Sequence, residues 1–135
     1  MSNQVRVLVS GRGHGVALVL DEPLSFWGGI DPATGAVIDV HHPQAGSVVA
    51  GCVLVMPAGR GSSSSSYVLA ESVRSGTAPV AIVLAEPDAI IALGALVATE
   101  LYGTNLPVVV APRAVLATGD LVAVDTAADP AIVRS

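Results

Sequence analysis

The spacing of hydrophobic and polar residues changes character halfway along the chain. Residues 4–10 alternate, with Val5, Val7 and Val9 apolar, and residues 15–20 form a nearly continuous apolar run. These patterns predict two β-strands. Residues 24–51 are instead rich in Gly, Pro, Asp and His, which predicts a long loop with one short strand at residues 36–40.

The second half alternates short apolar runs with longer helix-like segments. The pattern predicts, in chain order, strand 52–56, helix 65–75, strand 80–85, helix 88–102 and strand 107–111. Gly76 and Gly103 follow the two helices and are typical of helix ends. Because the apolar runs lack polar alternation, they are typical of parallel strands covered by helices. We therefore expect an α/β fold with a β-rich first half followed by a β-α-β-α-β unit.

The ends and the length of the chain complete this prediction. A last strand is expected at residues 121–125, and the tail after residue 127 is expected to be poorly constrained. The chain has 135 residues, and we expect one domain covering residues 1–135. The longest apolar stretch, at residues 89–98, is too short to span a bilayer, and no signal segment opens the chain. We therefore expect a cytoplasmic protein with no membrane partner.

Charge and composition exclude several function classes. The formal net charge is −5, and none of the six basic residues is a lysine. Nucleic-acid binding through phosphate neutralisation is not expected, and neither a Schiff base nor a P-loop can form without lysine. Cys52 is the only cysteine, so the chain cannot hold an iron–sulfur cluster unaided, and we expect no metal ligands on it. Its place inside an apolar run favours a buried, structural thiol.

The segment between strand 52–56 and helix 65–75 is the strongest candidate site. Gly59, Arg60 and Gly61 are followed by five serines, Ser62 to Ser66. Where glycines and hydroxyl residues lead into a helix, backbone N–H groups converge and can hold an anion. Arg60 adds a planar, permanently charged guanidinium group, which can donate two hydrogen bonds to a carboxylate or phosphate. A flexible connector is the alternative, but connectors join domains, and so the pattern favours an anion-binding or catalytic loop.

Three weaker signals lie in the first half. The glycines of residues 11–15 suggest a nucleotide loop, but a strand follows instead of a helix, which favours a hairpin-like turn. His41 and His42 are adjacent and point to opposite faces of an extended chain, so they are not expected to share a metal ion. Residues 26–31 concentrate two aromatics in a loop and form either a small satellite core or a lip over a cleft. The candidate contacts with a partner or substrate in this half are Trp27, Gly28, Gly29, Asp31 and His42.

The motifs also resemble those of a known family, the swivel domain or small subunit of aconitase X hydro-lyases. The matching segments are SFWGGIDPATGAVIDVHHPQAG at residues 25–46, MPAGRGSSSSS at residues 56–66 and ESVRSGTAPVAIV at residues 71–83. The resemblance implies a swivelling β/β/α domain that closes over the iron–sulfur cluster of a larger partner subunit. It therefore implies a heterodimer in which this chain binds no cofactor itself.

The resemblance also implies the roles of individual residues. In ordinary aconitases the first serine of the corresponding loop removes the proton, and the motif carries that role to Ser62. Arg60, Gly61, Ser63 and Ser64 are then expected to bind the substrate. Ser64 stands where ordinary aconitases have an arginine, and the extra serines leave open which of Ser62 to Ser66 is the base. The implied reaction is dehydration of a hydroxy acid, either cis-3-hydroxy-L-proline or 5-phosphomevalonate.

Two other functions remain open at this stage. A phosphocarrier domain would carry its histidine near a helix entry, where this chain has only serines, so that His14, His41 and His42 are its remaining candidates. A non-catalytic module could use the same loop to bind an anion.

Overall fold

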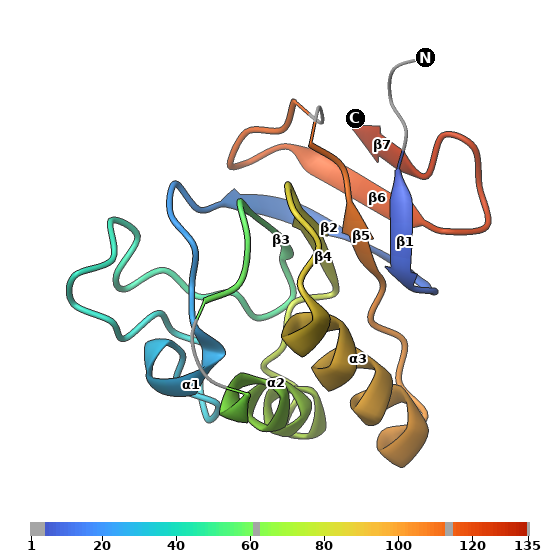
Figure 1. Ribbon diagram of the computed structural model, residues 1–135. Helices are drawn as coiled ribbons and strands as arrows, with labels where there is room; N and C mark the ends of the chain where they lie inside the picture. Colours follow the sequence, from blue (N-terminus) through green and yellow to red (C-terminus); the bar gives the residue numbers. More distant parts are fainter. Residues whose placement is uncertain (1–4, 61–62, 113–114, 135) are drawn as a thin grey trace.

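The computed structural model describes residues 5–60, 63–112 and 115–134. Within these residues the strands lie in the order β1-β5-β4-β3-β2-β6-β7 (Figure 1). The elements in chain order are β1 (Arg6–Val9), β2 (Arg12–Val19), α1 (Phe26–Gly29), β3 (Val53–Met56), α2 (Ser64–Ser75), β4 (Ala81–Leu84), α3 (Ala89–Tyr102), β5 (Val108–Val110), β6 (Leu121–Asp125) and β7 (Ile132–Arg134).

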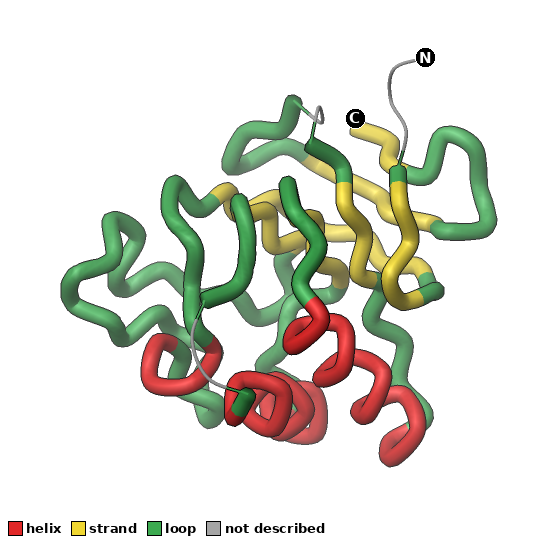
Figure 2. The backbone as a smooth tube through the Cα atoms, viewed as in Figure 1, coloured by secondary structure: helices red, strands yellow, loops and turns green. Residues whose placement is uncertain are grey.

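The centre of the sheet is parallel. β2 pairs with β3, β3 with β4 and β4 with β5, and their carboxyl ends therefore lie along one edge. The helices cover one face, as Figures 1 and 2 show, because apolar side chains of α2 and α3 pack on that face. This core includes Leu54, Ile82, Leu69 and Ile91. The crossovers through α2 and α3 return each strand to the same direction, which is how a β-α-β-α-β order builds a parallel sheet.

β2 belongs to two layers at once. Its first part pairs with β6, from Arg12 opposite Asp125 to Val16 opposite Leu121, and its last part pairs with β3. Side chains of β6 then pack against the sheet face that the helices leave uncovered, in a core that includes Val53, Val83, Val109, Val122 and Val124. The result is three layers, a small antiparallel sheet, the parallel sheet and the helices, and it confirms the predicted β/β/α fold.

The hairpin-like turn predicted at residues 11–15 is wrong. Residues 12–15 lie inside β2, and only the chain before them turns. β1 pairs with β5 at the far side of the parallel sheet, whereas β2 pairs with β3 and β6. The two strands that are adjacent in the sequence are therefore not neighbours, because the parallel strands form between them.

Three further expectations in the loops and the tail need correction. The strand predicted at residues 36–40 does not form in the described structure, where Val37 and Ala36 make isolated bridges to Ile30 and Val48. The tail is ordered at β7, which pairs with β6 from Ile132 to Arg134. The short helix α1 was not predicted at all.

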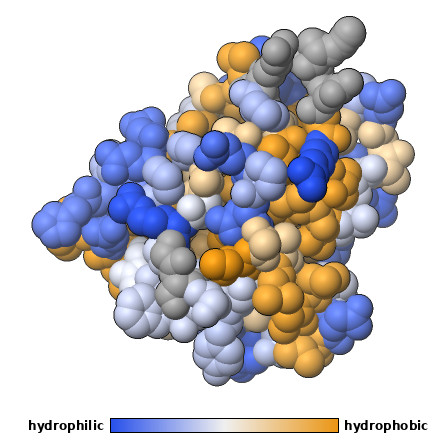
Figure 3. All heavy atoms as spheres, in the orientation of Figure 1, coloured by the Kyte–Doolittle hydropathy of each residue, from blue (hydrophilic) through white to orange (hydrophobic). Residues whose placement is uncertain are grey.

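The surface over α3 is apolar. Leu93, Leu96 and Leu101 are each about half exposed or more, and apolar atoms gather over this helix in Figure 3. In the chain segments that the structure describes, we find no helix with the length and apolar character that crossing a membrane requires.

Candidate functional site

The serine loop lies at the carboxyl edge of the parallel strands. It follows β3, and it is flanked by the segments that follow β2 and β4. Leu24, after β2, forms a parallel bridge with Gly59, and the Glu86 N–H, after β4, donates to the Pro57 carbonyl at 3.1 Å. In open α/β sheets ligands bind outside this edge, so the fold places the loop where a ligand site is expected.

Gly59 brings the loop close to the start of α3. A Cβ atom at this position would lie 2.4 Å from Oδ2 of Asp88 and 2.8 Å from Cγ1 of Ile91. Asp88 in turn caps α3, because its side chain accepts from the N–H groups of Ile90 and Ile91. No side chain fits at position 59 unless the Asp88 carboxylate and the Ile91 side chain shift, which explains the first glycine of the motif.

Arg60 is anchored through one nitrogen of its guanidinium group, and its side chain is more than half exposed. Nη2 donates to the Pro23 carbonyl at 3.3 Å and lies 3.9 Å from Oε1 of Glu22. More than half of each of the two charged side chains is exposed, so this ion pair contributes little to stability. The guanidinium is therefore oriented by the neighbouring strand end while it remains accessible to an anion.

The serines that follow occupy different environments. Gly61 and Ser62, the predicted base, lie outside the described residues. Ser63 is the N-cap of α2, where its side chain makes no capping hydrogen bond to the described residues, and both Ser63 and Ser64 are exposed. Ser66 instead donates from Oγ to the Ile90 carbonyl at 2.6 Å, which joins α2 to α3.

Ser65 is the most buried of the described serines in this run. Its side chain is 2% exposed, and Oγ accepts from the Trp27 N–H at 3.2 Å. Ser65 and Ser66 are thus engaged in packing the helices. The exposed serines of the loop come before them, at the end nearer Arg60.

The predicted lip, residues 26–29, lies beside this loop. Phe26 is fully buried, whereas the Trp27 side chain is 58% exposed and its backbone reaches Ser65. Gly28 is exposed and Gly29 is buried. The structure therefore brings Trp27 and Ser65 together and buries Phe26 in a satellite core. A cleft beneath the exposed Trp27, and its contact with a partner or substrate, stay predictions.

Asp31 and His42 lie within the long loop and have internal partners. Oδ1 of Asp31 accepts from the Ala33 N–H at 2.9 Å and so closes a turn. His42 is buried, and its Nδ1 accepts from the Gln44 N–H at 3.0 Å, which leaves Nε2–H to donate to the Glu22 carbonyl at 3.1 Å. His42 therefore fixes the strand end that orients Arg60. Substrate or partner contacts of Asp31 and His42 stay predictions.

The described residues do not fit an iron–sulfur cluster. Across residues 5–60, 63–112 and 115–134, no three His, Cys, Asp or Glu side chains come together as a metal site. Cys52 is partly buried, its thiol donates to the Val48 carbonyl at 3.6 Å, and burial raises the pKa of the thiol. A raised pKa disfavours the thiolate that would bind iron.

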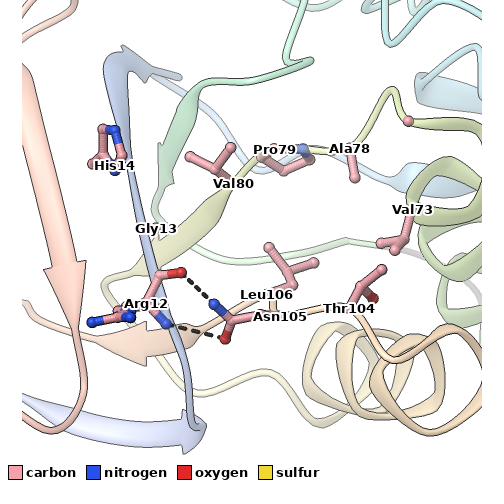
Figure 4. Close-up of a pocket in the computed structure, with 11 residues that line it drawn as sticks. Arg12, Gly13, His14, Val73, Ala78, Pro79, Val80, Thr104, Asn105 and Leu106 are labelled. Carbon is pink, nitrogen blue, oxygen red and sulfur yellow. Dashed lines mark hydrogen bonds between the residues drawn. The ribbon is translucent and has the colours of Figure 1, made fainter.

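Two pockets flank the parallel sheet at opposite edges. One, of about 590 Å³, lies at the carboxyl ends of β4 and β5 and includes Arg6 and Glu86 in its lining. The other, of about 380 Å³, lies at the amino ends of the strands (Figure 4). There Asn105 accepts from the Arg12 N–H and donates to the Arg12 carbonyl, and Val73, Val80 and Leu106 form an apolar lining. The second pocket is remote from the loop.

Comparison with known proteins identifies the family. The sequence profile of the aconitase X swivel domain matches residues 2–133. The chain belongs to the aconitase X swivel-domain family. This confirms the resemblance that the three motifs indicated.

The curated relatives of this chain carry two different names. A cis-3-hydroxy-L-proline dehydratase of Pseudomonas aeruginosa is 52% identical over 103 residues, which is 76% of this chain and 18% of that protein. The phosphomevalonate dehydratase small subunit of Methanothermobacter thermautotrophicus is 47% identical over 98 residues, which is 73% of this chain and 75% of that subunit. The chain therefore spans less than a fifth of the first relative and most of the second.

A solved structure supports the same placement. The crystal structure of Thermococcus kodakaraensis aconitase X, in its holo-form, superposes with a TM-score of 0.85 at 37% identity, covering 98% of this chain and 95% of that one. Nearly the whole chain, including the β6–β7 layer that sequence patterns predicted only in part, therefore follows the aconitase X swivel fold.

Proposed function

We propose that this chain is the swivel subunit of a two-chain hydro-lyase that dehydrates a hydroxy acid. The observation that carries the proposal is the position of the family's serine loop, at the carboxyl edge of β3, with Arg60 exposed beside the first turn of α2. The relative named a small subunit matches this chain over 75% of its own length, which supports a separate, larger partner.

In this proposal Ser62 accepts the proton. Dehydration removes a proton from one carbon and a hydroxyl group from its neighbour, and the electron pair of the broken C–H bond forms the new double bond. Ser62 Oγ, ionised to the alkoxide, takes that proton and becomes a neutral hydroxyl. The leaving hydroxyl group takes a proton from a general acid, which we assign to the partner subunit, and departs as water. The burial of Ser65 and the contact of Ser66 with the Ile90 carbonyl support an assignment among the earlier serines, because Ser65 and Ser66 pack between helices whereas Ser63 and Ser64 are exposed.

Arg60, Gly61, Ser63 and Ser64 bind the substrate carboxylate in this proposal. The N-terminus of a helix such as α2 contributes about 0.3–1 kcal/mol to anion binding, so it cannot hold the substrate alone. The exposed guanidinium of Arg60 supplies a full charge and a bidentate fork. The names of the two relatives indicate the substrate class, cis-3-hydroxy-L-proline or phosphomevalonate, and the described residues do not distinguish these two substrates.

Aconitase X enzymes depend on an iron–sulfur cluster, and the described residues of this chain offer no ligand set for it. We therefore propose that the cysteine ligands belong to the larger partner subunit. The contribution of this chain is the proton acceptor and the anion-binding loop.

The proposal is tested by co-expressing the chain with the aconitase-X-type large subunit encoded in the same genome. Dehydration of both candidate substrates is measured for the wild-type pair, Ser62→Ala and Ser75→Ala. Loss of a general base typically lowers the rate by about 10²–10⁴-fold, so Ser62→Ala is expected to lose at least about a hundredfold in kcat. Ser75, exposed at the end of α2, is the matched control and should keep full activity.

Two outcomes would contradict the proposal. Full activity in Ser62→Ala would remove Ser62 as the base. Dehydratase activity of this chain without any partner would contradict the two-chain arrangement.

A further inference from the structure

Ser65 has a buried hydroxyl that the proposed reaction does not use. We propose that Ser65 and Ser25 form a hydroxyl clasp that fixes Trp27 against the first turn of α2, and that Ser65 is a positioning residue of the site. The effect on catalysis rests on the proposed function. The clasp itself does not, because it is a property of this chain alone.

The clasp is a closed ring of three hydrogen bonds. The Trp27 N–H donates to Ser65 Oγ at 3.2 Å, and Ser25 Oγ donates to the Trp27 carbonyl at 2.9 Å. The two hydroxyl oxygens lie 3.2 Å apart. Since each hydroxyl has one proton, and that of Ser25 is already donated, Ser65 must be the donor to Ser25. Both backbone groups of Trp27 are thus held, and each serine donates once and accepts once.

The lip needs such a clasp because it has little regular structure. α1 has only four residues, and Trp27 within it has φ −81° and ψ 114°, which is not helical. Gly28 follows with φ 80°, in the left-handed region. Trp27 therefore lacks the backbone ladder of a longer helix, and the serine pair supplies partners for its N–H and carbonyl groups.

The clasp also links two parts of the proposed site. Ser65 lies in the first turn of α2, directly after the exposed Ser63 and Ser64, whereas Trp27 is the exposed aromatic residue of the lip. Ser65 follows Ser62 by three positions in the sequence, and its hydroxyl makes the contact with the lip. A shift of the Ser65 hydroxyl would therefore change the distance between the lip and the loop.

Trp27 is the only tryptophan, so its fluorescence reports on the lip. We would measure acrylamide quenching and the emission maximum of the full 135-residue chain as wild type, Ser65→Ala and Ser72→Ala. Ser72 is the matched control because it lies on the same helix, is equally buried, and its Oγ has no hydrogen-bond partner among the described residues. Both variants remove one buried oxygen, but only Ser65→Ala opens the ring.

We expect Ser65→Ala to raise the quenching constant and shift the emission to the red, and Ser72→Ala to match the wild type. Ser25→Ala removes the other hydroxyl and should give the same change, and the double variant should add little to either single change because one ring is opened in each case. Wild-type quenching in Ser65→Ala or in Ser25→Ala, or an equal change in Ser72→Ala, would overturn the clasp. If Ser65→Ala does not fold, the quenching constant of Ser25→Ala tests the clasp instead.

In the assembled enzyme the same variants test the positioning role. Ser65→Ala is expected to lower kcat/KM about tenfold, the size of one positioning hydrogen bond, while Ser72→Ala stays at the wild-type value. An unchanged kcat/KM in Ser65→Ala would refute the positioning role even with altered quenching. Loss of activity in Ser62→Ala is a separate result, so a failure of the proposed function and a failure of the clasp can be told apart.

Discussion

Identical residues in one run have different roles here because their burial differs. Ser63 and Ser64 are exposed, Ser65 is enclosed between α1 and α2, and Ser66 reaches α3. The sequence predicts a site somewhere in this run, since hydroxyls and glycines precede a helix. It cannot assign the individual serines, because five equal side chains carry no information on which of them will be covered.

His42 shows the same limit for a single side chain. A histidine beside another histidine in a polar loop predicts a solvated residue or a contact. The structure buries it, with both ring nitrogens bonded to backbone groups of residues 22 and 44. Residue 44 is two positions from His42 and residue 22 is twenty positions away. No local sequence pattern predicts the distant partner.

Cys52 provides a prediction at this scale. Because burial raises the pKa of its thiol, the folded chain has less thiolate than the unfolded chain at any mildly alkaline pH. Alkylation of Cys52 by iodoacetamide speeds up as the thiol ionises. The pH at which it becomes fast should therefore be higher in the native chain than in the same chain unfolded by urea. Mass spectrometry of the two samples over a pH series measures this, with Cys52→Ser as the unlabelled control. A native thiol that reacts at lower pH than the unfolded one would contradict the prediction.

Helix ends were the most predictable part of the elements. Gly76 and Gly103 end α2 and α3 in the left-handed conformation, as their positions in the sequence predict. The starts of α2 and α3 were also predicted to within one residue. α1 escaped prediction because its four residues are stabilised by Ser65, which lies far along the chain, and not by a local apolar period.

The two main helices start in different ways, and this gives a testable difference. α3 begins at Asp88, whose carboxylate accepts from two backbone N–H groups at 2.9 and 3.0 Å. Loss of such a cap costs about 0.5–2 kcal/mol. Asp88→Ala is therefore expected to lower the free energy of urea unfolding by about 1 kcal/mol, whereas Asp88→Asn, which keeps an acceptor, should lose much less. Equal losses in the two variants would show that the cap is not the cause.

At the scale of the whole molecule, the decisive feature is that one strand serves two sheets. β2 crosses from the antiparallel layer to the parallel one, and Gly13 lies where it passes over the start of β4. A Cβ atom at Gly13 would be 2.2 Å from the Val80 carbonyl oxygen and 3.0 Å from its carbon. The backbone of one layer thus contacts the backbone of the other directly, and any side chain would separate them.

Gly13→Ala is accordingly expected to destabilise the fold severely. Overpacking in a core typically costs about 1–3 kcal/mol, and the loss here should reach at least the upper part of that range because backbone atoms cannot move aside singly. Urea unfolding measures the loss. His14→Ala is the matched control, since His14 is the next residue on β2 and is exposed. It should change stability by no more than about 0.5 kcal/mol, and a comparable loss in the two variants would contradict the explanation.

The sequence by itself determined the elements with local causes, namely the apolar runs of the parallel strands, the ends of α2 and α3 and the identity of the serine motif. The tertiary structure alone decided which strands are neighbours, that the tail joins β6, and which serine clasps the lip. Periodicity and turn residues act over a few positions, whereas pairing and burial depend on residues far apart in the chain. That is why residues 12–15, read as a turn, became the strand that joins the two sheets.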